Sequence, residues 1–66
     1  MKQIEKEVYK KVKENNGADL TCLVEFFNET YDELDIIEGL KSLSYLGVIK
    51  EIKTLGQKTP YYMVIR

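Results

Sequence analysis

The chain opens with one apolar stripe at helical spacing. Its members recur every fourth position among lysines and glutamates: Ile4, Val8 and Val12. This spacing predicts an amphipathic helix from Lys2 to Glu14 that turns one side toward a core. The following Asn15-Asn16-Gly17 should end it, because glycine readily adopts the left-handed conformation found after many helices.

A shorter apolar segment predicts a second helix from Cys22 to Phe27. Its inward-facing residues are Leu23, Val24 and Phe27. Thr21 offers a hydroxyl as the N-cap, and residues 18–20 are too few for more than a bridge or a single extended residue. Cys22 is the only cysteine, and we expect it to be a small apolar core residue.

The third predicted helix has the clearest start. Asp32 is placed as its N-cap, with Tyr31 and Ile36 positioned to form a hydrophobic staple, and a shifted register with Thr30 as the cap is the alternative. The inward stripe consists of Ile36, Ile37, Leu40 and Leu43. The helix should end near position 46, since Gly47 can adopt the left-handed cap conformation.

After Gly47 the pattern changes to β-branched and aromatic residues, which favour strands. These residues are Val48, Ile49, Ile52, Tyr61, Tyr62, Val64 and Ile65. The polar segment between the two groups contains Gly56 and Pro60, which suit a loop and the entry to a strand. The pattern therefore predicts a β-hairpin with a lysine-bearing tip.

This order of elements resembles the winged helix-turn-helix superfamily. LKSLSYLGVI (40–49) resembles the end of that family's third helix, where two leucines three apart precede a glycine and an apolar strand entry. LTCLVEFFNETYDELDII (20–37) resembles its second helix, turn and third-helix start, and VIKEIKTLGQKTPYYMVI (48–65) resembles its wing. The resemblance implies an α+β fold, a single winged-helix domain over residues 1–66 with a three-helix core and a C-terminal β-hairpin wing.

Charge is unevenly distributed, although the net charge is only −1. Residues 47–66 sum to +3 and residues 1–18 to +2, whereas residues 19–46 sum to −6. A chain with no histidine and one cysteine lacks the commonest general base and the usual zinc ligands, so we expect no enzyme, no cofactor and no metal site. The apolar runs are too short for a membrane span and no signal peptide is seen, so we expect a cytoplasmic protein.

The first functional hypothesis is a non-enzymatic protein that binds double-stranded DNA, such as a small transcriptional regulator. In the winged-helix family the third helix commonly enters the major groove and the wing contacts the backbone or minor groove. The residues expected to contact DNA are Lys41, Ser42, Lys50, Lys53, Gln57, Lys58 and Thr59. Lysines attract phosphates and polar side chains donate hydrogen bonds to them. One copy should bind weakly, so we expect a homodimer on paired half-sites.

The acids of the third helix favour a different hypothesis. Asp35 and Glu38 are predicted to face outward, where the phosphates of a duplex would repel them. Asp35 lies in the first turn and complements the helix dipole, but Glu38 lies too far along for that account. The alternative is therefore a protein-binding module with little or no DNA binding, whose partner is a second copy or another protein. Its predicted face consists of Leu34, Asp35, Glu38 and Tyr45.

Overall fold

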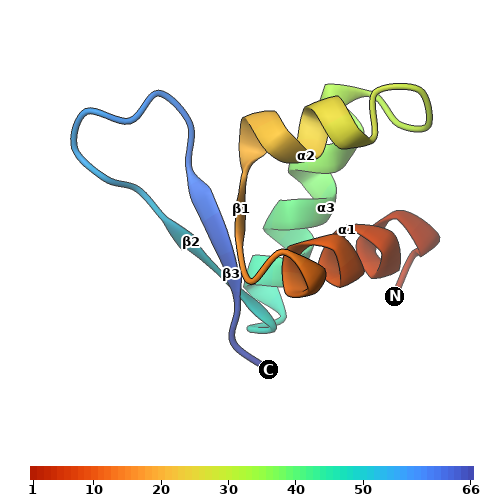
Figure 1. Cartoon of the computed structure of the whole chain (residues 1–66). Helices are drawn as coiled ribbons and strands as arrows, with labels where there is room; N and C mark the ends of the chain where they lie inside the picture. Colours follow the sequence, from red (N-terminus) through yellow and green to blue (C-terminus); the bar gives the residue numbers. More distant parts are fainter.

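In the computed structural model, which describes residues 1–66, three helices pack beside a three-stranded antiparallel sheet (Figure 1). The helices are α1 (Gln3–Glu14), α2 (Leu20–Phe26) and α3 (Glu33–Tyr45), and the strands are β1 (Ala18–Asp19), β2 (Ile49–Ile52) and β3 (Tyr61–Val64). The strand order β1-β3-β2 places β3 in the centre. The predicted α+β class is confirmed, with three helices followed by a hairpin. None of the helices is both long and apolar enough to cross a bilayer.

All six elements contribute to one apolar cluster. Its ten buried residues are Val8, Val12, Ala18, Leu23, Phe27, Ile36, Leu40, Leu43, Ile49 and Tyr62. The predicted stripes of α1 and α3 supply half of them, since residues three or four apart share one side of a helix. Burial of this apolar surface is the main favourable contribution to folding.

The turn after α1 is held by two residues with left-handed backbone. Asn16 has φ 55° and Gly17 has φ 114°. A Cβ on Gly17 would lie 2.8 Å from Cε2 of Tyr61, so the chain requires glycine there for both its conformation and the space. Asp32 is the N-cap residue of α3, as predicted, in extended conformation but without a side-chain hydrogen bond.

Two expectations about α2 are wrong. The helix begins at Leu20, and its N-cap is Asp19, not Thr21: Oδ1 of Asp19 accepts a 2.7 Å hydrogen bond from the Cys22 backbone N–H. Cys22 is exposed, because Leu23 and Phe27 occupy the buried side of the helix and Cys22 points about 100° away from Leu23. It is therefore not a core residue.

The hairpin gains a third strand where the sequence predicted no more than a bridge or a single extended residue. Ala18 pairs with Tyr62 and Asp19 with Tyr61, so β1 covers the edge of β3 that β2 leaves open. On the other edge β2 and β3 pair in register, with Glu51 opposite Tyr62. The loop that joins β2 to β3 extends beyond the helical part of the molecule (Figure 1).

Candidate functional site

The loop between β2 and β3 carries the exposed lysines predicted to contact DNA. Lys53, Gln57 and Lys58 are all exposed. The loop turns at Gly56, which has φ 93°, and the Gln57 N–H donates a 3.0 Å hydrogen bond to the Thr54 carbonyl. The tip of this loop is therefore polar and positively charged, and it lies away from the core.

Thr59 does not share this position. It is half-buried and lines a shallow depression between the loop and the start of α2. The other lining residues are Leu20, Thr21, Val24, Glu25 and Glu33. The chain is already returning toward the body here, since Pro60 accepts a 3.1 Å hydrogen bond from the Leu20 N–H. Thr59 is thus less available to a ligand than the sequence suggested.

The lysines of the hairpin lie on two different faces of the sheet. Side chains alternate along a strand, so Lys50 points away from Ile49, which faces the core. The amine of Lys53 lies 3.7 Å from Oε1 of Glu51, on the face that Glu51 shares with Ile49. Lys50 and Lys53, both predicted to contact DNA, therefore cannot form one cluster. Of the two, only Lys53 lies beside the exposed residues of the loop.

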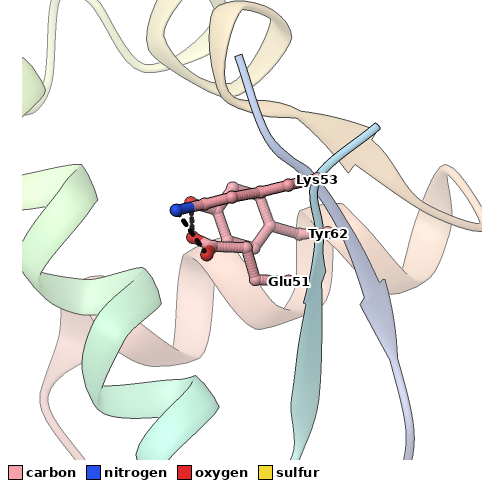
Figure 2. A network of polar contacts seen from close by, with 3 residues as sticks. All are labelled: Glu51, Lys53 and Tyr62. Carbon is pink, nitrogen blue, oxygen red and sulfur yellow. Dashed lines mark hydrogen bonds and ion pairs between the residues drawn. The ribbon is translucent and has the colours of Figure 1, made fainter. Parts of the chain in front are cut away.

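Glu51 links the loop to the buried part of the sheet. The Tyr62 hydroxyl donates a 3.0 Å hydrogen bond to Oε2 of Glu51, while Oε1 faces Lys53. Figure 2 shows the three side chains on the side of the sheet where α3 lies. Burial raises the pKa of the Tyr62 hydroxyl far above its usual value, and the hydrogen bond to Glu51 raises it further. The ion pair with Lys53 is exposed, and such pairs contribute only about 0–1 kcal/mol, so Lys53 is free to exchange Glu51 for another anion.

The exposed side of α3 forms a single ridge, which we call the α3 ridge: Leu34, Glu38, Lys41 and Tyr45. These residues are spaced by four, three and four positions, and at about 100° per residue they line up along one side of the helix. Leu34 is 71% exposed and Tyr45 is 91% exposed. The ridge contains one predicted DNA contact, Lys41, and three residues of the alternative protein-binding face.

Asp35 and Ser42 lie on the flank of the α3 ridge that faces α1. Asp35 is exposed, but Ser42 is half-buried and is not part of the outward face. The reason is that α1 passes close to α3 on this flank: a Cβ on Gly39 would lie at ordinary contact distance, 3.9 Å, from Cγ1 of Ile4. Ser42 therefore lies at the edge of a depression beside α1, where a DNA groove would reach it poorly.

The sequence reasoning missed several exposed apolar residues, among them Phe26, Met63 and Ile65. Three others lie next to the surfaces described above. Met1 and Leu46 are 61% and 53% exposed and lie near Tyr45 around a shallow depression at the end of α3. The third, Leu55, is fully exposed at the tip of the hairpin. Leu46 follows the ridge directly, and Leu55 is the one apolar residue in a polar loop, so the pattern did contain a signal for both. All three extend surfaces already described.

Five exposed acidic side chains lie close together in the middle of the sequence, from α2 to the first turn of α3. The exposed acids that precede or begin α3 are Glu25, Glu29, Asp32, Glu33 and Asp35. No group of three or more acidic, histidine or cysteine side chains is arranged to hold a metal ion.

Comparison of the chain with protein-family models, with curated proteins and with solved structures gives no match. Function is therefore inferred from the chain's own residues.

Proposed function

We propose that the chain is a small winged helix-turn-helix domain that binds double-stranded DNA without enzymatic activity, as a transcriptional regulator does. The observation that carries the proposal is the pair of exposed lysines, Lys53 and Lys58, on a loop that extends beyond the helices. In this proposal hairpin β2–β3 is the wing and supplies the main contact. Double-stranded DNA carries about one negative charge per 1.7 Å of axis, which attracts such a loop strongly.

The α3 ridge has a smaller part in this contact. Lys41 can reach a phosphate, but Glu38 lies one turn away on the same ridge and Asp35 lies beside it. The chain's only arginine is Arg66, at the C-terminus and outside the ridge, so no side chain here makes the bidentate contact that most often recognises guanine. Binding should accordingly depend on phosphates more than on base sequence. Three phosphate contacts, from Lys41, Lys53 and Lys58, correspond to a slope of about −3 in log affinity against log salt concentration.

Fluorescence anisotropy with a labelled random duplex at several salt concentrations tests the proposal. Lys53→Glu with Lys58→Glu should abolish binding and flatten its salt dependence. The matched control is Lys10→Glu with Lys13→Glu, which makes the same change of net charge on exposed positions of α1. Unchanged binding by the hairpin variant, or an equal loss in the α1 variant, would refute the wing as the DNA contact.

A second candidate function is favoured by the exposure of the α3 ridge. Leu34 and Tyr45 leave apolar surface in water on both sides of Glu38, and an exposed tyrosine is typical of protein-binding surfaces. In this case Glu38→Lys with Tyr45→Ala removes the interaction with a protein partner, and the hairpin variant leaves it intact. Loss of the partner only in the hairpin variant would contradict this second function.

A further inference from the structure

The α3 ridge is complementary to itself when its direction is reversed. Four positions separate Leu34 from Glu38, and four separate Lys41 from Tyr45. A second α3 laid antiparallel therefore places Leu34 opposite Tyr45 and Glu38 opposite Lys41. We propose that a second copy of this chain binds here, with the two α3 helices packed antiparallel about a two-fold axis.

The spacing of the α3 ridge is the one that helix pairs require. Steps of four, three and four residues keep a stripe facing a neighbouring helix, as the a and d positions of a coiled coil do. The eleven residue-to-residue steps from Leu34 to Tyr45 rise about 16 Å along the axis, which is three turns of contact. A two-fold axis makes every contact twice, as in most homodimers.

Charge selects the antiparallel arrangement over the parallel one. In the antiparallel pair each Glu38 faces a Lys41 of the second copy, and the contact occurs twice near the axis. A parallel pair would put Glu38 against Glu38 and Lys41 against Lys41, which repel. Antiparallel helices also bring opposite ends of their dipoles side by side.

Exposed apolar side chains lie at both ends of the proposed contact. Leu34 of the second copy would meet Tyr45 next to the depression that Met1 and Leu46 also line. Covering these side chains removes apolar surface from water, which favours association. One helix ridge is smaller than the roughly 800 Å² per partner of a standard stable interface, so the dimer should dissociate on dilution.

Self-association on the α3 ridge does not depend on the proposed DNA binding. The hairpin lysines Lys53 and Lys58 lie outside the ridge, on the loop between β2 and β3. Only Lys41 is shared, since in the dimer it faces Glu38 of the second copy and leaves the DNA contact to the hairpin. The two properties can therefore fail separately: a chain that dimerises without binding DNA, and one that binds DNA without dimerising, are distinct results. The experiment is accordingly done on the whole chain without DNA.

Analytical ultracentrifugation over a range of protein concentrations measures the dimer. Glu38→Lys and Lys41→Glu should each weaken it by at least about tenfold, because each turns two attractive contacts into repulsive ones. The double variant, Glu38→Lys with Lys41→Glu, restores the opposite charges and should return the dissociation constant to within about threefold of the original. Glu25→Lys, an exposed position on α2, is the control for net charge and should change little.

Disulfide trapping tests the register. In a Cys22→Ser background, Leu34→Cys with Tyr45→Cys should form a covalent dimer on oxidation, whereas either cysteine alone should not. The two positions lie about 16 Å apart within one helix, too far for an internal disulfide. A chain that stays monomeric to about 1 mM, a charge exchange that fails to rescue, or trapping by Leu34→Cys alone overturns the proposal.

Discussion

The Tyr62 hydroxyl donates a 3.0 Å hydrogen bond to Oε2 of Glu51, directly across the β2–β3 pair. The other oxygen of the same carboxylate lies 3.7 Å from the Lys53 amine. One side chain thus connects a buried tyrosine to an exposed lysine of the loop. Substitution of Glu51 should therefore change the charge of the hairpin and its affinity for DNA. Substitution of Tyr62 should change the stability of the fold.

Replacing Glu51 by glutamine should strengthen DNA binding. The amide oxygen of glutamine still accepts from the Tyr62 hydroxyl, but the negative charge beside Lys53 is gone, so Lys53 no longer has to leave a carboxylate to reach a phosphate. An exposed ion pair contributes about 0.2–1 kcal/mol, so the affinity for duplex DNA at low salt should rise by up to about fivefold. Glu29→Gln makes the same change of charge at an exposed position before α3. Equal gains from both variants would mean that only net charge matters.

Replacing Tyr62 by phenylalanine should destabilise the fold at neutral pH. The ring remains in the core, but Glu51 loses its donor, and a hydrogen bond to a charged group contributes about 1.5–3 kcal/mol, less where water can replace the donor. Because Glu51 is exposed, we expect a loss of about 1 kcal/mol. Urea unfolding followed by circular dichroism measures it. No loss, in a variant with an unchanged denaturant slope, would show that water replaces the hydroxyl fully.

The same substitution should reduce the alkaline sensitivity of the protein. Burial and the Glu51 hydrogen bond raise the pKa of Tyr62 in the folded state above its value of about 10 in the unfolded chain. The native state therefore keeps this proton while the unfolded state releases it, so the stabilisation is complete below about pH 10 and is lost as the pH rises further. Tyr31, whose pKa is raised by its hydrogen bond to Glu7, contributes in the same direction. Tyr62→Phe should show a shallower fall in melting temperature above pH 10 than the original chain, and an identical fall would contradict this account.

The fold was predictable where local pattern decides it. The apolar stripe of α1 and the start of α3 at Asp32 follow from residue spacing and helix-end preferences. The third strand was not predictable, because β1 exists only by pairing with β3, more than forty residues later in the chain. Pairing over that distance leaves no periodic signal in a two-residue strand.

The candidate site was predictable in part for a similar reason. Helical geometry correctly predicted that Lys41, Glu38 and Tyr45 are exposed, since they lie opposite the apolar stripe. Ser42 and Thr59 are half-buried because of contacts with distant segments. Their burial depends on how α1 approaches Gly39 and how the loop returns to α2. Such contacts between distant segments cannot be deduced from the spacing of apolar residues along the chain.

Two glycines should respond to alanine in opposite directions. Gly17→Ala should cost at least about 1–3 kcal/mol, because its φ of 114° strains a residue with a Cβ and the Tyr61 ring occupies the space. Gly39→Ala should instead stabilise the chain by up to about 1 kcal/mol, since alanine favours the interior of α3 and its Cβ would make an ordinary contact with Ile4. Thermal unfolding should separate the two by more than about 8 °C.

Gly56 supplies the control for the Gly17 result. Its φ is also positive, at 93°, but a Cβ there would meet no atom within 4 Å. Gly56→Ala should therefore show the backbone cost alone and lose less stability than Gly17→Ala. If the two variants were equally destabilised, the Tyr61 ring would have no part in the requirement for glycine.

The start of α2 gives a direct test of the corrected helix cap. Asp19→Ala should destabilise the chain by about 1 kcal/mol, because Oδ1 of Asp19 is the acceptor that satisfies the Cys22 N–H at 2.7 Å. Thr21→Ala should change stability by less than about 0.5 kcal/mol, since Thr21 lies within the helix with its side chain exposed. Asp19→Asn keeps an acceptor oxygen at the same place and should recover most of the loss. A larger loss of stability from Thr21→Ala than from Asp19→Ala in urea unfolding would contradict Asp19 as the cap of α2.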